Sequence, residues 1–305
     1  MKKIVLAASI LCLAMATKAQ KEIPLYEGPV PDSKPCTVKE SSAVPGRVSG
    51  VTIPTLAIFY PTQPDSFRTS VLIFPGGGYA RLATGHEGYD IAREFNKYGI
   101  TAFVVKYRLP NDTCMTNKEN VPLEDAQQAI KLLRSKAAGW NLDPTKIGII
   151  GFSAGGHLAA SLCTKFGKAL IPNKNKASLR PDFMILGYPV ISFSDSLAHK
   201  GSRENLIGKN ASEEMIKAYS NELLVTPETT PTFLFHAADD KTVNVQNSIV
   251  FYQALLLNKV PAEMKLYQRG SHGFGMNNKT TNDKWFPQVI NWIMSNGWMK
   301  GDVGM

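Results

Sequence analysis

The chain has 305 residues, a formal net charge of +9 and 44% hydrophobic residues, a length that suits one large α/β domain or two small ones. Lys and Arg are scattered along it without a basic run or an interleaved aromatic patch, which gives no support for nucleic-acid binding. Beyond the N-terminus no apolar segment approaches the length of a bilayer span, so we expect no stable membrane insertion.

Residues 1–19 have the features of a secretory signal peptide. A short lysine-containing start precedes an apolar run over residues 4–16, and small residues form a cleavage site ending at Ala19. We predict cleavage near Ala19 and export to the periplasm or the extracellular space. Cys12 makes a lipoprotein anchor the alternative, but a lipoprotein signal needs a small residue directly before the cysteine, and Leu11 occupies that position. Removal of the three lysines in this segment would lower the net charge from +9 to +6.

Residues 20–50 are rich in Pro, Ser, Glu and Lys without periodicity, and we expect an irregular lead-in there. From residue 51 onward, short apolar segments alternate with helical ones, which predicts parallel strands joined by helices. No break divides 51–305, so we predict a single domain without a large lid. We expect strands at 51–60, 70–74, 102–107, 146–150, 183–188, 232–236 and 263–267, and helices at 89–98, 123–138, 154–162, 245–257 and 282–294.

Residues 151–155 read Gly-Phe-Ser-Ala-Gly, the G-x-S-x-G pattern of a nucleophile elbow. The pattern lies between an apolar, β-branched segment and a helical segment of small residues, which is the context that the chemistry requires. It sets Ser153 on a sharp turn at the positive end of a helix dipole. The simpler interpretation is that Ser153 only caps the helix.

A serine nucleophile needs a base to take its proton. His272 lies in a Gly-rich segment beyond the last predicted strand and ahead of the last helix, which is where this fold places the base. A His held in a Gly-rich turn is the alternative. His157 falls one turn into the helix that follows Ser153 and should point away from its Oγ, while His236 ends a strand and should be structural or support the site.

The base in turn needs an acid to orient it, and that acid should follow the preceding strand. Asp239 and Asp240 are the candidates there. The Asp-x-x-Val spacing to Val243 fits Asp240, which leaves Asp239 as a turn residue.

The oxyanion of a tetrahedral intermediate needs preorganised N–H donors. We expect one from Ala154, the residue after the nucleophile. Gly76, Gly77 and Gly78 follow an early apolar strand, where backbone without side chains can approach a substrate. A flexible turn would look the same, but this position upstream of the elbow favours Gly77 and Gly78 as the other donors.

Three cysteines would survive signal cleavage, and they show no C-x-x-C or metal-ligand spacing. Cys163 is expected to be a small core residue. An exported protein can form a Cys36–Cys114 disulfide in an oxidising compartment, although the sequence does not establish one. The chain also lacks H-E-x-x-H, so we expect neither metal nor cofactor.

With these parts placed, the chain resembles the α/β-hydrolases and, more narrowly, bacterial secreted acetyl xylan esterase-like proteins. The resemblance covers about residues 50–298, and one departure is Pro75, where the HGGG-type motif has His. Glu87 matches a recurrent family position, to which we assign only a surface or loop-anchoring role. The matching stretches are Phe74–Tyr79, His86–Gly88, Tyr107–Pro110, Asp125–Gln127, Gly151–Leu158, Gly187–Val190, His236–Val243 and Gly273–Gly275.

The resemblance implies an α/β-hydrolase fold, with a mostly parallel central sheet covered by helices on both faces. It also implies removal of acetyl groups from xylan-type polysaccharide or its oligosaccharides through an acyl-enzyme, without a cofactor. Ser153 would attack the ester, His272 would carry the proton and Asp240 would hold His272. The alternatives are a feruloyl or general short-chain carboxylesterase or lipase and, from another class, a non-catalytic carbohydrate-binding protein on a hydrolase scaffold. No oligomeric state is predicted.

Overall fold

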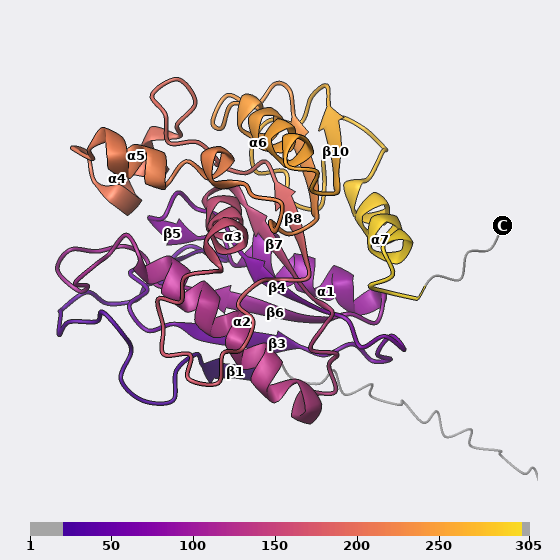
Figure 1. Ribbon diagram of the computed structural model, residues 1–305, viewed down its shortest axis with the longest axis horizontal. Helices are drawn as coiled ribbons and strands as arrows, with labels where there is room; N and C mark the ends of the chain where they lie inside the picture. The colour runs from indigo at the N-terminus through magenta and orange to yellow at the C-terminus, as the bar shows by residue number, and fades with distance from the viewer. Residues whose placement is uncertain (1–20, 301–305) are drawn as a thin grey trace, which may run out of the picture.

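The computed structural model describes residues 21–300, so the predicted signal peptide at 1–19 lies outside the described residues. An eight-stranded sheet runs through the molecule in the order β1-β3-β6-β4-β7-β8-β9-β10 (Figure 1). The pairs from β6 to β10 are parallel, and only β1 and β3 are antiparallel to their neighbours. The strands are β1 Lys21–Pro24, β3 Thr55–Phe59, β4 Ser70–Phe74, β6 Thr101–Lys106, β7 Ile147–Phe152, β8 Phe183–Gly187, β9 Thr232–Ala237 and β10 Ala262–Tyr267.

The central strands β4, β7 and β8 are buried along their whole length. Their sequences are nearly continuous apolar runs, as required of parallel strands that are covered on both faces. One apolar cluster packs α2, α3 and α6 on one face, and a second packs α1 and α7 on the other (Figure 1). The predicted α/β-hydrolase architecture is confirmed. The helices are α1 Asp90–Lys97, α2 Val121–Trp140, α3 Ser153–Lys165, α4 Lys200–Ile207, α5 Glu213–Ala218, α6 Gln246–Leu257 and α7 Trp285–Ser295.

The N-terminal lead-in is less irregular than predicted. Residues 21–24 form β1, which pairs antiparallel with β3 and extends the sheet edge. Further along, β2 (Val48–Ser49) pairs with β5 (Arg81–Leu82). A Cys36–Cys114 disulfide ties the same segment to the body of the domain. Short edge strands add through backbone hydrogen bonds and need no apolar pattern, so periodicity could not reveal them.

Two short helices, α4 and α5, stand between β8 and β9 where no helix was predicted. Both are short and offer few apolar positions, so neither has a clear amphipathic stripe, although α4 buries Ser202, Leu206 and Ile207. Their N-caps do follow local chemistry, because His199 Nδ1 accepts a hydrogen bond from the Ser202 N–H, and Ser212 Oγ accepts one from the Met215 N–H. The insertion is small, in agreement with the expected lack of a large lid.

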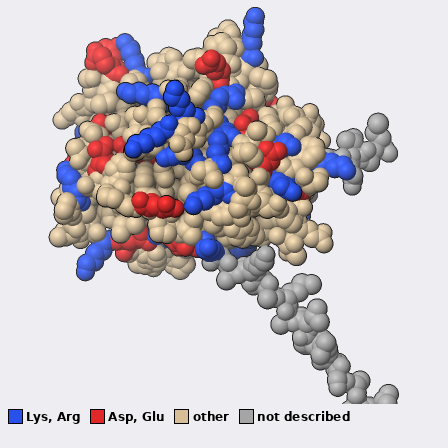
Figure 2. All heavy atoms as spheres, turned by 60° about the horizontal axis from the view of Figure 1, so that its bottom comes forward, with Lys and Arg blue, Asp and Glu red and all other residues tan. Residues whose placement is uncertain are grey.

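Among the helices in residues 21–300, none has the length and apolar character needed to cross a bilayer. On the face drawn in Figure 2, Lys and Arg side chains are interspersed with Asp, Glu and uncharged residues. This distribution matches the scattered basic residues of the sequence.

Candidate active site

Ser153 stands at the sharp turn between β7 and α3, as predicted. It is the first residue of α3 and directly follows Phe152, the last residue of β7. Its φ of +52° lies in the left-handed region, which is unusual for a residue with a side chain. The turn also depends on Gly155, since a Cβ there would lie 2.1 Å from the Phe74 carbonyl oxygen. The sequence of the elbow is therefore dictated by close backbone packing.

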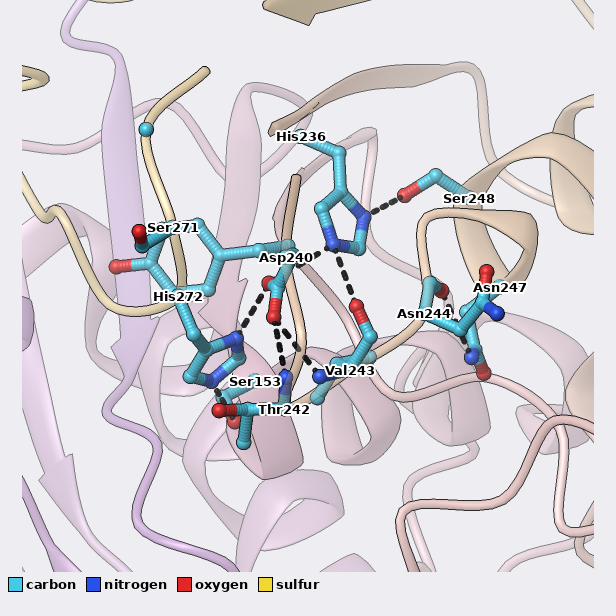
Figure 3. Close-up of polar contacts among 12 residues, drawn as sticks. Ser153, His236, Asp240, Thr242, Val243, Asn244, Asn247, Ser248, Ser271 and His272 are labelled. Atoms are coloured by element: carbon cyan, nitrogen blue, oxygen red, sulfur yellow. Dashed lines mark hydrogen bonds and ion pairs between the residues drawn. The ribbon is translucent and has the colours of Figure 1, made fainter. Parts of the chain in front are cut away.

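Ser153, His272 and Asp240 form one hydrogen-bonded chain (Figure 3). His272 Nε2 lies 2.9 Å from Ser153 Oγ, and His272 Nδ1 lies 2.7 Å from Asp240 Oδ2. A carboxylate can only accept, so Nδ1 carries the proton of the neutral ring and Nε2 accepts from the serine hydroxyl. The structure thus brings the three residues together in the arrangement that activates a serine nucleophile.

Asp240 is buried and fully engaged at both carboxylate oxygens. Oδ1 accepts from the backbone N–H groups of Thr242 at 2.8 Å and Val243 at 2.9 Å. Oδ2 accepts from His272 and also from His236 Nε2, 3.1 Å away. Burial alone would raise the pKa of Asp240, but the hydrogen bonds from His236 and His272 outweigh it and hold this pKa well below its usual range. Asp240 is therefore ionised when it faces His272.

Asp239 does more than occupy a turn. Its Oδ1 accepts from the backbone N–H groups of Gly270 at 2.9 Å and Ser271 at 2.8 Å. Those two residues directly precede His272, so Asp239 anchors the loop that carries His272. The adjacent aspartates hold the same histidine in different ways, one through its ring and one through its backbone.

His236 and His157 are both fully buried, but their rings contact different groups. The His236 ring contacts Asp240 and, through Nδ1, the Ser248 hydroxyl at 2.8 Å. His157 instead contacts the Tyr79 hydroxyl at 2.9 Å and the Tyr219 carbonyl at 2.8 Å, and burial lowers its pKa to about 3. His157 is thus a neutral core residue, and His236 supports the site.

Gly77 and Gly78 line a pocket of about 480 Å³ together with Ser153 and His272. The Gly76 N–H is already used, because it donates to Glu87 Oε2 at 2.9 Å. Within residues 21–300 the N–H groups of Gly77 and Gly78 donate to no other group. The Ala154 N–H is in the first turn of α3, where helical N–H groups have no intrahelical partner. The three predicted donors are therefore free to bind an anion.

Glu87 is a buried anchor of the glycine loop. Besides the Gly76 N–H, it accepts a 2.9 Å hydrogen bond from the Tyr188 hydroxyl at Oε1. The rings of Tyr188 and His272 in turn pack edge to face, with centroids 5.0 Å apart. Of the two roles expected for Glu87, a surface carboxylate is wrong and loop anchoring fits. Pro75, the departure from the HGGG pattern, is fixed by a 2.7 Å hydrogen bond from the Tyr107 hydroxyl to its carbonyl oxygen.

A family model described as BD-FAE matches residues 56–255, well over half of the chain. The chain belongs to the BD-FAE family. It is 34% identical over 245 residues to an acetylxylan esterase from Xylanibacter ruminicola, an alignment that covers 79% of this chain and 48% of that protein. It is also 34% identical over 248 residues to endo-1,4-beta-xylanase B from Butyrivibrio fibrisolvens, an alignment that covers 81% of this chain and 36% of that protein. The chain thus spans about half, or less, of the length of these two curated relatives.

Solved structures agree with the family assignment. An acetyl ester-xyloside bifunctional hydrolase from Caldicellulosiruptor lactoaceticus superposes with a TM-score of 0.76 at 34% identity, over 92% of this BD-FAE chain and 97% of that one. A carboxylesterase from Lactobacillus plantarum, with a TM-score of 0.65 at 24% identity over 88% and 100% of the two chains, supports the fold alone. The predicted resemblance to α/β-hydrolases and acetyl xylan esterase-like proteins is confirmed.

Three other features of this BD-FAE protein concern its larger cavity, its metal-ligating side chains and its free cysteine. A larger cavity of about 810 Å³ lies between the β1 segment and α2, but none of Ser153, His272 and Asp240 lines it. Over residues 21–300, no group of three or more His, Cys, Asp or Glu side chains could hold a metal ion. The free Cys163 is buried in the core on α3, as expected.

Proposed function

We propose that this protein is an exported serine esterase that removes acetyl groups from xylan-type polysaccharide or its oligosaccharides. The observation that carries the proposal is the hydrogen-bonded chain from Ser153 through His272 to Asp240, beside a pocket lined by Gly77 and Gly78. The acetylxylan esterase relative supports the choice of acyl group and of sugar.

In the first half of the reaction, His272 Nε2 takes the proton of the Ser153 hydroxyl while Oγ attacks the acetyl carbonyl carbon. The carbonyl oxygen becomes an oxyanion, which accepts hydrogen bonds from the N–H groups of Gly77, Gly78 and Ala154. His272 then gives its proton to the sugar oxygen, the bond from carbon to that oxygen breaks, and the deacetylated sugar leaves. An acetyl group stays on Ser153.

The second half of the reaction repeats these steps with water as the nucleophile. His272 takes a proton from a water molecule, whose oxygen attacks the acetyl-serine carbonyl. Collapse of the second tetrahedral intermediate breaks the bond to Ser153 Oγ, which recovers its proton from His272, and acetate leaves. Asp240 stays ionised throughout and stabilises the imidazolium form of His272 in each half. No cofactor enters any step.

Two further features support the proposal. The pocket is lined mainly by small and polar side chains, among them His199, Asn205 and Thr242, which suits a hydroxylated sugar better than a long apolar acyl chain. The signal-like N-terminus and the Cys36–Cys114 disulfide fit an exported protein, because disulfides persist in oxidising compartments.

The decisive experiment measures acetate release from acetylated xylan, acetylated mannan, acetylated pectin and simple acetylated sugars. We expect the highest kcat/KM on acetylated xylan or its oligosaccharides, and loss of release in Ser153→Ala with unchanged circular dichroism. Rates on butyryl and feruloyl esters test the alternative of a general or feruloyl esterase. Turnover retained by Ser153→Ala would overturn the mechanism, and folded wild type without activity on any ester would favour a non-catalytic binding protein.

A further inference from the structure

Among the side chains that line the pocket beside Ser153, arginines outnumber carboxylates. Two arginines, Arg47 and Arg81, and the histidines His86 and His199 line it together with the site residues. The only carboxylate among its lining residues is Glu87, which is buried and already bonded to the Gly76 N–H and the Tyr188 hydroxyl. The two guanidinium groups are therefore not neutralised inside the pocket.

Arg47 and Arg81 also lack partners elsewhere. Within residues 21–300, neither guanidinium group makes a hydrogen bond or an ion pair, and both side chains are exposed. Several other arginines of this protein are paired with carboxylates: Arg108 pairs with Asp125 at 2.8 Å, and Arg203 pairs with Asp195 at 2.6 Å. Arginine carries a fixed charge and a planar set of donors that matches a carboxylate. These two groups are thus free for an anionic ligand.

The fold holds both arginines beside the proposed oxyanion loop. The Arg81 N–H donates to the Gly77 carbonyl at 3.2 Å, and a Cβ placed on Gly77 would lie 3.0 Å from Arg81 Cγ, so the Arg81 stem lies against that glycine. Arg47 directly precedes β2, which pairs with β5 in the register Ser49↔Arg81. The paired β2 and β5 segments therefore carry both arginines, and both side chains line the pocket.

We propose that Arg47 and Arg81 bind a carboxylate on the carbohydrate part of the substrate, that is, a uronic acid unit next to the acylated sugar. The inference rests on the proposed function and narrows its substrate class. Ser153 is only 6% exposed whereas both arginines are exposed, so their ligand must project outward from the ester. A sugar substituent does this, whereas product acetate formed at Ser153 would lie deeper in the pocket.

The first test compares acetylated xylo-oligosaccharides that carry a glucuronic acid branch with the same oligosaccharides lacking it. We expect kcat/KM for acetate release to be about threefold to tenfold higher with the branch, as suits an exposed Arg–carboxylate contact. High salt should reduce the preference. Acetylated galacturonic acid oligosaccharides form a third arm, which distinguishes a branch uronate from a backbone uronate.

The variants Arg47→Gln and Arg81→Gln should each lower the ratio of the two kcat/KM values, and the double variant should bring it to about one. Arg68→Gln is the matched control, because Arg68 is also exposed and without a side-chain partner in the described residues. It precedes the start of β4, whereas Ser153 follows the end of the parallel strand β7, so the two lie at opposite ends of these strands. The control should leave the ratio unchanged. A wild-type ratio of one, or a ratio that the double variant does not alter, would overturn the inference.

A binding measurement separates this inference from the proposed function. Calorimetry on Ser153→Ala, with deacetylated xylo-oligosaccharides as the probe, reports the preference for the glucuronic acid branch without any turnover. We expect tighter binding of the branched probe, lost when both arginines are replaced. Equal binding of the two probes contradicts the inference, whereas failure of wild type to release acetate contradicts the proposed function.

Discussion

His236 Nε2 lies 3.1 Å from Asp240 Oδ2, the same oxygen that accepts the hydrogen bond from His272. The Ser248 hydroxyl, 2.8 Å from His236 Nδ1, can donate to that nitrogen, which leaves Nε2 as the protonated nitrogen of a neutral ring. His236 therefore donates to Asp240 from inside the core. The acid of the proposed triad is oriented by a second histidine as well as by two backbone N–H groups.

Replacing His236 tests this arrangement. We expect His236→Phe to lower kcat about tenfold with a smaller effect on KM, because Asp240 loses a charge-assisted hydrogen bond that orients it. His236→Gln, which can still place an N–H toward Asp240, should recover part of that loss. Steady-state kinetics and thermal unfolding of both variants provide the measurement. Equal losses of kcat in the two variants would assign the effect to packing alone.

Asp240 and its neighbour Asp239 can be compared through the same substitution, because each accepts hydrogen bonds that hold His272 or its loop. Asp240→Asn should lower kcat by about 10³-fold to 10⁴-fold, because an amide favours the wrong tautomer of His272. Asp239→Asn should cost less than about tenfold, since an amide oxygen can accept the same two backbone N–H groups. Acetate release by both variants checks the prediction. A large loss of kcat in Asp239→Asn with little loss in Asp240→Asn would reverse the assignment of the acid.

Gly77 and Gly139 should respond oppositely to alanine. A Cβ on Gly77 would lie 2.2 Å from the Arg81 carbonyl oxygen, and its φ of +131° disfavours any side chain. Gly77→Ala should therefore lower both kcat, by about tenfold or more, and the melting temperature. Gly139 lies in α2 with nothing within 4 Å of an added Cβ, so Gly139→Ala should stabilise by about 0.5–1 kcal/mol. Thermal unfolding and kinetics distinguish the two.

Stability should depend on pH through Glu124. Burial and the nearby Asp32 carboxyl raise the pKa of Glu124 to about 7, although Arg108 opposes this. The folded protein then holds a proton that the unfolded chain loses near pH 4.3. The free energy of unfolding should therefore fall as the pH rises from about 4.5 to 8, by on the order of 2–3 kcal/mol from this group.

Urea unfolding over that pH range checks the Glu124 prediction. Residue 124 cannot ionise in Glu124→Gln, so the stability of this variant should decline less than that of wild type between about pH 4.5 and 8. Glu263→Gln serves as the control, because Glu263 is exposed on β10. Parallel curves for wild type and Glu124→Gln would contradict the prediction.

The disulfide should contribute to stability by restricting the unfolded chain. Cys36 and Cys114 are 78 residues apart in sequence, and closing a loop of that length is worth up to about 4 kcal/mol. We expect the double variant Cys36→Ser, Cys114→Ser to unfold at lower urea concentration than wild type. Reduction of wild type with dithiothreitol should reproduce the shift. An unchanged urea midpoint in both cases would show that the link adds nothing to stability.

Local sequence patterns predicted the parts of the site that come directly after a strand in the chain. The elbow at Ser153, the glycine loop and the position of His272 each depend on a few adjacent residues with a fixed relation to a strand end. The contact between Glu87 and Tyr188 could not be read in this way, because the two residues are 101 positions apart in sequence. His236 lies only four residues before Asp240, and its predicted structural or supporting role left open which group its ring contacts. The helices α4 and α5 were missed because they are short and offer few apolar positions.

The sequence by itself determined the class of fold and the kind of chemistry, since the apolar runs, the helical periodicity and the G-x-S-x-G elbow are local consequences of burial and backbone geometry. Only the tertiary structure decided which groups support the chemistry. Folding brings the buried Glu87 to the hydroxyl of Tyr188, 101 residues further along the chain, and directs two unpaired arginines to the pocket. Such contacts depend on the packing of distant segments, which no short stretch of sequence encodes.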